Sequence, residues 1–370
     1  MRPTLGKMLA AVVLVALPFA AAQQLRVMTH DSFSLPTELV ERFEARSGIE
    51  VVFISGGDAG EALNRAILTR GRPIADVLFG VDGALLERAR GAGVFEPYES
   101  PSLSRVPSGL RIASDHLVTP VDVGYVVPNV DVQALAQAGF SPGEVSLPGL
   151  ASAELAPLTV VMNPATSSPG LAFLLATVRY FGDPQAGVDP AAPAEARGGF
   201  DDWLAFWAAL AEAGVLVTDG WTDAYYTAFS RYGGDRPIVV SYATSPPAEA
   251  IFAEQPLDVA PTMNLTCDGC AYRQVEGVGI LAGTSARAAA EAFVEFLLSA
   301  DVQAAIPLEM FVAPVVEGTP VPEEFELYGT LPESAVAAPL DPAVIAENQE
   351  RWLSQWTAVV LQGREPGSVR

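Results

Sequence analysis

Short apolar runs alternate along this chain with segments in which apolar residues recur every three or four positions. Runs of the first kind predict buried β-strands, and segments of the second kind predict helices with one buried face. Six strands are expected, at residues 25–29, 50–55, 75–80, 118–127, 158–162 and 237–242. Five helices are expected between and after them, at residues 37–47, 84–90, 171–180, 200–213 and from Pro342 onward.

The helix expected at 200–213 illustrates how these boundaries are recognised. Asp201 and Asp202 stand at its start, where carboxylates accept hydrogen bonds from the free N–H groups of a first turn. Trp203 and Trp207 follow on one face, and Gly214 ends the pattern. Because near-continuous apolar strands alternate with helices of this kind, we predict an α/β fold in which helices cover both faces of the sheet.

The first 22 residues have the pattern of an export signal. Arg2 and Lys7 precede an uncharged run from Met8 to Ala22, and small residues, Ala20 and Ala22, occupy the positions that signal peptidase reads. The run is shorter than the about 20 residues that a membrane-spanning helix needs. We therefore expect cleavage after Ala22 and export of the mature chain, with a retained N-terminal anchor as the alternative.

Composition narrows the possible classes of protein. The chain has 370 residues, which suits two domains of about 100–200 residues each. It carries 44 acidic residues against 21 basic ones, for a net charge of -23. This negative field repels polyanions at long range, so a generic nucleic-acid-binding protein is excluded, and it favours a soluble monomer.

The sequence contains little that indicates catalysis. It lacks a Gly-x-Ser-x-Gly nucleophile motif, a phosphate-binding Walker loop and a dinucleotide fingerprint. Its only histidines are His30 and His116, too few for a histidine-rich metal site. Asp58 and Glu61 form a possible carboxylate pair, but such pairs are common by chance in an acidic chain. We assign no catalytic residue, no metal ligand and no cofactor.

The two cysteines lie close together, in the segment Cys267-Asp-Gly-Cys270. In an oxidising compartment, such a pair most simply forms a local disulfide that tightens a loop. A redox-active pair would instead open a helix after a strand, whereas the preceding residues 264–266 have turn-like composition. We therefore expect a structural disulfide between Cys267 and Cys270.

Small polar and aromatic residues gather in loops at the carboxyl ends of the expected strands, where open α/β sheets bind their ligands. These loops are residues 29–33, 56–60, 163–171, 219–225 and 241–246. Together they offer a helix start able to bind an anion, the carboxylate of Asp58 and several aromatic rings. This combination favours a ligand with a flat cationic ring and a hydroxyl or phosphate tail.

At these loops the chain resembles the thiamine-binding periplasmic proteins of ABC transporters. The resemblance extends over residues 24–362 and rests on six motifs: Thr-His-Asp-Ser-Phe at 29–33, Ala-Asp-Val-Leu-Phe-Gly at 75–80, Ser-Ser-Pro-Gly-Leu at 167–171, Gly-Trp at 220–221, Ser-Tyr-Ala-Thr-Ser-Pro at 241–246 and Ala-Ile-Pro at 305–307. It implies a two-lobed type II solute-binding fold, each lobe a mixed sheet flanked by helices. It also implies that the cleft binds thiamine or its phosphate esters in the periplasm and delivers them to permease subunits.

The resemblance assigns ligand contacts to ten positions of this sequence. They are Asp58, Ala59, Ser167, Ser168, Trp221, Tyr242, Ala243, Thr244, Ser245 and Phe311. The chain departs from the family pattern at three places: His30 stands where a Tyr is expected, no Trp follows the segment Asp-Ser-Phe at 31–33, and Ala248 stands where a stacking Tyr would help. We include His30 and expect Tyr225, Tyr226 or Tyr272 to complete the aromatic cage, with Tyr225 as the first candidate.

The type II fold implies that the chain passes twice between its lobes. Extended, glycine-containing segments at 120–124 and 274–279 are the candidate crossings. Lobe one would then combine residues 23–121 with 277–370, and lobe two would be residues 122–276.

Two other functions remain open at this point. A ferric-ion-binding protein of the same fold class is suggested by Tyr225 and Tyr226, because two phenolates suit a hard trivalent cation. A thiaminase-like enzyme would use a cysteine nucleophile. Cys267 and Cys270 are its only candidates, and neither has a histidine nearby in the sequence to activate it.

Overall fold

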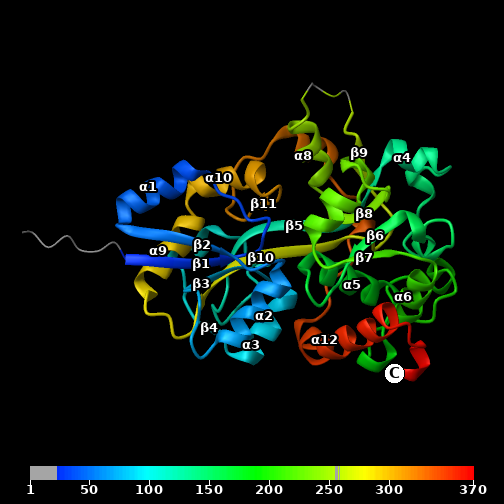
Figure 1. The fold of residues 1–370 in the computed structure, drawn as a ribbon, viewed down its shortest axis with the longest axis horizontal. Coiled ribbons are helices and arrows are strands. Elements are labelled where there is room, and N and C mark those ends of the chain that lie inside the picture. Colours follow the sequence, from blue (N-terminus) through cyan, green and yellow to red (C-terminus); the bar gives the residue numbers. More distant parts are fainter. Residues whose placement is uncertain (1–22, 255–256, 258) are drawn as a thin grey trace, which may run out of the picture.

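One mixed sheet of eleven strands forms the centre of the computed structural model, which describes residues 23–254, 257 and 259–370 (Figure 1). The proposed export signal, residues 1–22, lies outside the described residues. Eight strands follow the order β2-β1-β3-β10-β5-β8-β6-β7, and β4, β9 and β11 pair beside this path. The strands are β1 (Gln23–Thr29), β2 (Ile49–Ser55), β3 (Val77–Asp82), β4 (Phe95–Glu96), β5 (Thr119–Asp131), β6 (Thr159–Met162), β7 (Leu216–Thr218), β8 (Ile238–Tyr242), β9 (Thr262–Asn264), β10 (Tyr272–Leu281) and β11 (Ala313–Pro314).

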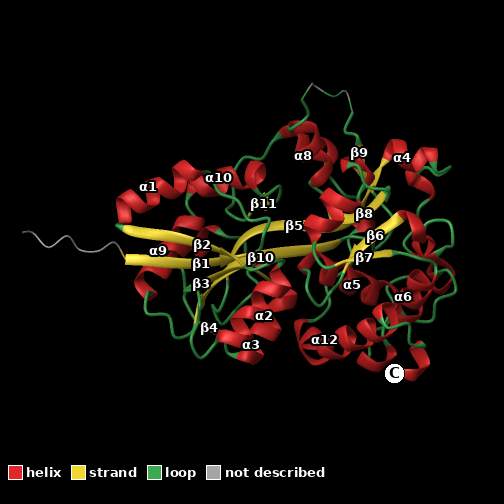
Figure 2. Ribbon diagram, viewed as in Figure 1, coloured by secondary structure: helices red, strands yellow, loops and turns green. Residues whose placement is uncertain are grey.

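Helices lie on both sides of the strands (Figure 2), which confirms the predicted α/β class. They are α1 (Thr37–Ser47), α2 (Ala59–Thr69), α3 (Gly83–Ala92), α4 (Val132–Gln137), α5 (Ser168–Phe181), α6 (Trp203–Glu212), α7 (Trp221–Asp223), α8 (Ser245–Ile251), α9 (Arg287–Leu297), α10 (Ala300–Glu309), α11 (Glu323–Tyr328) and α12 (Pro342–Trp356). Among the described residues, no helix has the length and apolar character needed to cross a membrane.

All six predicted strands and all five predicted helices are present in the structure, with ends that differ by a few residues. Helix α2 was not predicted, because it begins in a glycine-rich loop and buries mainly alanine. Its buried face consists of Ala59, Gly60, Ala62, Leu63 and Ala66, a set with little apolar contrast along the sequence. Tertiary packing against β3 and α3 stabilises this helix instead.

The two longest strands, β5 and β10, pair antiparallel across the middle of the sheet, from Tyr272 opposite Val126 to Val278 opposite Thr119. On one side of this pair, β2, β1 and β3 run parallel, and on the other side β8, β6 and β7 run parallel. The register shifts next to Gly277, where an added Cβ atom would lie 2.4 Å from the carbonyl oxygen of Thr119. The two segments expected to cross between the lobes, residues 120–124 and 274–279, lie within β5 and β10.

The apolar interior divides into two large clusters. The smaller cluster fills the space between β1, β3 and the helices α1 and α9, with Leu25, Val77, Phe43 and Phe293 among its members. The larger cluster extends from α2 and α3 across to α5, α6 and α12. Each half of the sheet therefore has its own buried face, and the larger cluster also joins the two halves.

The C-terminal helix α12 packs on α6 and α3 (Figure 1). Trp356 meets Trp207 edge to face, with ring centroids 5.6 Å apart. The buried carboxylate of Asp183 accepts hydrogen bonds from Trp352 Nε1 and Arg351 Nη2, both at 2.6 Å. These contacts join the end of the chain to the segment that carries α5 and α6.

Cys267 and Cys270 are free thiols in this structure, so the expected disulfide is not formed. The Cys270 side chain is buried and directs its Sγ–H group to the backbone. Its acceptors are the carbonyl oxygens of Cys267, at 2.8 Å, and Leu265, at 3.4 Å. The prediction of a disulfide from spacing alone is therefore wrong for this structure.

Replacement of Asp183 by Ala should weaken the attachment of α12. The change leaves the buried Trp352 Nε1–H without an acceptor and removes a charged partner from Arg351, so we expect the free energy of unfolding to fall by about 2–3 kcal/mol. Urea denaturation of the mature protein measures this difference. The control is Asp189→Ala, which removes an exposed carboxylate from the same loop and should leave stability nearly unchanged. Equal stability of the two variants would contradict the role of Asp183.

Candidate functional site

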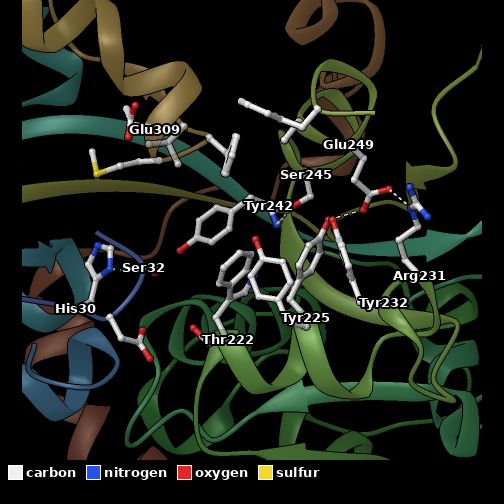
Figure 3. Close-up of a pocket in the computed structure, with 18 of the residues that line it drawn as sticks. His30, Ser32, Thr222, Tyr225, Arg231, Tyr232, Tyr242, Ser245, Glu249 and Glu309 are labelled. Carbon is white, nitrogen blue, oxygen red and sulfur yellow. Dashed lines mark hydrogen bonds and ion pairs between the residues drawn. The ribbon is translucent and has the colours of Figure 1, made fainter. Parts of the chain in front are cut away.

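A cavity of about 880 Å³ opens where the two halves of the sheet meet (Figure 3). Its walls come from the loop after β1, from α7 and the turns that follow it, from the end of β8, from α8, and from the segment between α10 and β11. Figure 3 shows Tyr242 near its centre, with His30 and Ser32 on one side and Tyr225 and Tyr232 on the other. Segments far apart in the sequence thus contribute to one cavity.

Aromatic rings form one wall of the cavity. Trp221 and Tyr225 stack with their ring centroids 4.9 Å apart and their planes inclined by 16°, and Tyr242 meets Trp221 edge to face at 6.2 Å. Trp221 Nε1 donates to Ser241 Oγ at 2.8 Å, which fixes the orientation of the indole. Tyr226 extends this wall, with its ring edge to face against Trp221. The wall therefore presents fixed aromatic surfaces to a ligand.

The buried carboxylate of Glu249, on α8, holds the aromatic wall in place. It accepts hydrogen bonds from Tyr225 OH at 2.5 Å, from Arg231 Nε at 3.1 Å and from Thr262 Oγ1 at 3.0 Å. Burial, with the negative charge of Glu249, raises the pKa of Tyr225 well above its ordinary value. Tyr225 is therefore a neutral hydrogen-bond donor in this structure.

Three acidic residues lie on strands β3, β5 and β10, at and below the floor of the cavity. Glu276 faces Asp82 and Asp122 across the strand register, and His30 Nε2 lies 3.5 Å from its carboxylate. Gln274 Nε2 donates to Asp82 at 2.8 Å. Burial raises the pKa of Asp82 to about 6. The floor thus gathers three carboxyl groups, of which Glu276 lines the cavity.

Asp122 is the least satisfied member of this acidic group. Its Oδ2 atom is buried and has no hydrogen-bond partner among the described residues. Burial first, and the charge of Glu276 second, raise the pKa of Asp122 well above its ordinary value, while His30 opposes the shift.

Six of the twelve predicted ligand residues line the cavity: His30, Trp221, Tyr225, Tyr242, Ser245 and Phe311. Tyr226 lines it as well, while Tyr272 is not among the described lining residues, so two of the three candidate tyrosines, Tyr225 and Tyr226, lie at the cavity. Ala248, at the position where a stacking Tyr was expected, also faces the cavity. The assignment of ligand contacts to these residues stays a prediction.

Two other predicted residues, Ala243 and Thr244, lie behind the cavity. Ala243 is buried and donates its backbone N–H to Tyr125. The hydroxyl of Thr244 donates to the carbonyl oxygen of Phe311, which has a left-handed backbone conformation with φ 56°. This conformation is unfavourable for a bulky residue. Thr244 therefore supports Phe311 from behind.

The last four predicted residues, Asp58, Ala59, Ser167 and Ser168, surround the start of α5 and are absent from the described cavity lining. Ser167 Oγ accepts from the backbone N–H of Gly170 at 3.3 Å and so caps the helix. The backbone N–H of Ser168 donates to the Asp58 carboxylate at 3.0 Å. The helix start that was predicted to bind an anion from the ligand therefore binds an anion of the protein.

Several lining residues were not identified from the sequence. They include Arg231, Tyr232, Glu249, Phe252, Glu276 and Glu309. Glu276 lies in a predicted crossing segment, and Tyr232 follows the loop 219–225 by seven residues. Both therefore lie in or near segments that the sequence motifs had indicated. The others come from helices and turns that only the fold brings to the cavity.

Replacement of Asp122 by Asn should stabilise the protein at high pH. Because its folded-state pKa is raised, Asp122 disfavours folding as the pH rises from about 4, near the unfolded-state pKa, through the folded-state pKa. At pH 8 we expect Asp122→Asn to raise the free energy of unfolding by about 1–3 kcal/mol, and at pH 4 we expect no difference. Denaturant unfolding at both pH values measures this.

Asp115→Asn is a control for which the change in stability at neutral pH should have the opposite sign. A hydrogen bond from Arg90 lowers the pKa of Asp115, so its carboxylate stabilises the folded state above the unfolded-state pKa. This variant should lose stability at neutral pH and match the parent protein in acid. A pH-independent effect of Asp122→Asn would contradict a raised pKa for this buried carboxyl group, which has no hydrogen-bond partner for Oδ2 among the described residues.

Comparisons with known proteins agree with this architecture. A family model described as "Bacterial extracellular solute-binding protein" matches residues 72–332. The "Thiamine-binding periplasmic protein" of Escherichia coli (strain K12) is 30% identical over 96% of this chain and 99% of its own length. The protein of the same name from Brucella abortus is 28% identical over 94% of this chain and 95% of its own length.

Solved structures give the same fold. A "Periplasmic thiamin binding protein" superimposes with a TM-score of 0.75 at 28% identity, covering 91% of this chain and 96% of that chain. Apo ferric ion-binding protein A of Pasteurella haemolytica superimposes with a TM-score of 0.67 at 18% identity, covering 92% and 98%, a likeness of fold alone. The resemblance indicated by the sequence motifs is confirmed, as is the periplasmic-binding-protein fold class. This chain belongs to the bacterial extracellular solute-binding protein family.

Proposed function

We propose that this solute-binding protein binds thiamine, and its phosphate esters, in the 880 Å³ cavity and delivers them to the permease of an ABC importer. The observation that carries the proposal is the stacked pair of Trp221 and Tyr225 beside a cavity floor that contains the acidic residue Glu276. Relatives named as thiamine-binding periplasmic proteins, which match the chain over nearly its whole length, support the choice of ligand.

Thiamine has the chemistry that this cavity accommodates. It joins a positively charged thiazolium ring to a flat aminopyrimidine ring, and aromatic faces attract such cations. Acidic side chains outnumber basic ones around the cavity. The acids are Asp31, Glu249, Glu254, Glu276 and Glu309, and the basic groups are Arg231 and His30. Arg231, with only its Nε atom bonded to Glu249, is the cation available to a phosphate tail.

We propose two lobes joined by β5 and β10. The first lobe comprises residues 23–121 and 277–341, and the second comprises 122–276 and 342–370. The last segment is placed in the second lobe, in contrast to the expectation from sequence, because α12 is attached to Asp183 and Trp207. We further propose that the mature protein acts as a periplasmic monomer, after cleavage following Ala22.

The ferric-ion function has less support. The described residues contain no group of three or more His, Cys, Asp or Glu side chains that could hold a metal ion. The Tyr225 hydroxyl is committed to Glu249, and its surroundings disfavour the phenolate form that ferric ion requires. Burial also raises the pKa of Tyr226 and raises the pKa of Tyr232 to about 12, so their phenolate forms are disfavoured as well.

A thiaminase-like activity also has less support, and we propose that the protein is not an enzyme. Cys267 and Cys270 are absent from the described lining of the cavity. Burial, together with the neighbouring Cys267, raises the pKa of the Cys270 thiol well above its ordinary value. A thiolate nucleophile is therefore disfavoured at the one buried cysteine.

Calorimetric titration of the mature protein tests the ligand. We expect thiamine, thiamine monophosphate and thiamine diphosphate each to bind with one site per chain and to raise the melting temperature. Ferric citrate should give neither heat of binding nor colour. No heat and no thermal shift with any of the three thiamine compounds would refute the proposed ligand.

Trp221→Ala should weaken thiamine binding at least about tenfold, because the stacked indole supplies cation–π attraction in a desolvated site. Trp221→Phe is the matched variant. It retains an aromatic face and loses the hydrogen bond to Ser241, so its affinity should lie between those of the parent protein and Trp221→Ala. The same titration measures both variants. Unchanged affinity of Trp221→Ala would remove this residue from the site.

A further inference from the structure

The imidazole ring of His30 occupies a fixed position on one side of the cavity (Figure 3). It packs against Phe79, with ring centroids 5.5 Å apart. Gly80 leaves room for the ring, because an added Cβ atom there would lie 2.8 Å from His30 Cδ2. The His30 side chain is only 12% exposed, yet it borders the cavity. A change in its charge would therefore act directly on a ligand.

Both ring nitrogens of His30 have a polar partner. Nε2 lies 3.5 Å from Glu276 Oε2, and Nδ1 lies 3.0 Å from Ser32 Oγ. The Ser32 hydroxyl can accept from the Nδ1–H group of a protonated ring or donate to the bare Nδ1 atom of a neutral ring. His30 can therefore gain or lose a proton at Nδ1 without leaving a polar group unpaired. Because Ser32 is exposed, this proton has access to solvent.

Carboxyl groups from three other elements face His30. They are Glu276 on β10, Asp122 on β5 and Asp58 at the start of α2. Burial favours the neutral ring, but these charges outweigh burial and raise the pKa of His30 above its ordinary value. Asp82 on β3 lies opposite Glu276 in the strand register, and Tyr242 on β8 is neutral because burial and the nearby acids raise its pKa. In the free protein, His30 therefore keeps its proton to a higher pH than an isolated histidine does.

We propose that His30 makes ligand binding proton-linked: a cationic ring that enters beside Glu276 expels the proton on His30 Nδ1, past Ser32, to solvent. This inference rests on the proposed binding of thiamine in the cavity. A protonated His30 and a thiazolium ring would both face the Glu276 carboxylate as positive charges, and water screens buried charges poorly. Loss of one proton removes this repulsion and leaves the Nε2–H group of a neutral His30 directed at Glu276.

This exchange links affinity to pH in one direction. Below the pKa of His30 in the free protein, a thiamine cation must displace a proton, so affinity falls as the pH falls. Above that pKa, His30 is already neutral and affinity no longer depends on this group. A tyrosine, the residue expected at this position from the family pattern, carries no charge near neutral pH and would not produce this dependence.

NMR titration of the ligand-free mature protein gives the first test, because only His30 and His116 contribute imidazole signals. We expect Glu276→Gln to lower the pKa of His30 by about 1 or more, since the variant removes the paired carboxylate. Glu309→Gln is the matched control, because Glu309 also lines the cavity but is bonded to Ser34 and is not among the groups that act on His30. An unchanged His30 pKa in Glu276→Gln would overturn the proposed pair, whether or not thiamine binds.

The same titration in saturating thiamine gives the second test. Thiamine should lower the pKa of His30 by about 1 or more. The signal of His116, which is absent from the described cavity lining, should respond to pH as it does in the free protein. An unchanged or raised His30 pKa in the thiamine complex would overturn the proton exchange and leave the proposed function standing. Failure of thiamine to bind at all would instead refute the ligand, and the exchange with it.

The dependence of affinity on pH gives the third test. Thiamine should bind the parent protein about tenfold more tightly at pH 8 than at pH 6, the ratio expected when one pKa changes by about 1. This ratio should be smaller for His30→Gln, which has no titratable ring. His116→Asn should keep the parental ratio, and Asn tolerates the left-handed backbone of this position, φ 58°. Equal ratios for the parent protein and His30→Gln would overturn the proposal, and thermal unfolding verifies that each variant is folded.

Discussion

The antiparallel pairing of β5 with β10 is the constraint on which the rest of the structure depends. Each strand belongs to both halves of the sheet, so their hydrogen bonds join two sets of parallel strands into one body. The bulge at Gly277 bends this pair where the halves meet. The cavity opens at that bend, and the acidic residues of its floor come from these strands and from β3. The pairing of β5 with β10 therefore both joins the two halves and places the acidic residues of the cavity floor.

Charge is distributed unequally around this site. The protein buries Asp82, Asp122 and Glu276 close together, an arrangement that costs folding free energy unless a cation or a proton compensates it. The aromatic wall beside them is held by Glu249, a carboxylate whose hydrogen bonds are satisfied. One acid thus positions the aromatic rings, while the others create a negative potential. This combination suits the proposed ligand, which carries a flat cationic ring.

Buried carboxylates also determine how separate segments come together. Asp58 lies between two helix starts in the two halves, and Asp183 attaches the C-terminal helix to the segment before α6. In both places an acid in one segment accepts hydrogen bonds from donors far away in the sequence. The large excess of acidic residues, which at first indicated only solubility and repulsion of polyanions, therefore also includes residues that organise the interior.

The sequence by itself determined the α/β class, the six predicted strands and the family, because apolar periodicity and short motifs are local properties of the chain. It also indicated the aromatic residues Trp221, Tyr225 and Tyr242. Only the tertiary structure decided that Asp58 and Ser168 bind each other, that Glu276 and Glu249 face the cavity, and that Cys267 and Cys270 are free thiols. These outcomes depend on which residues distant in the sequence become neighbours. The partner of a buried charge or helix end is set by the packing of whole elements and leaves no local pattern.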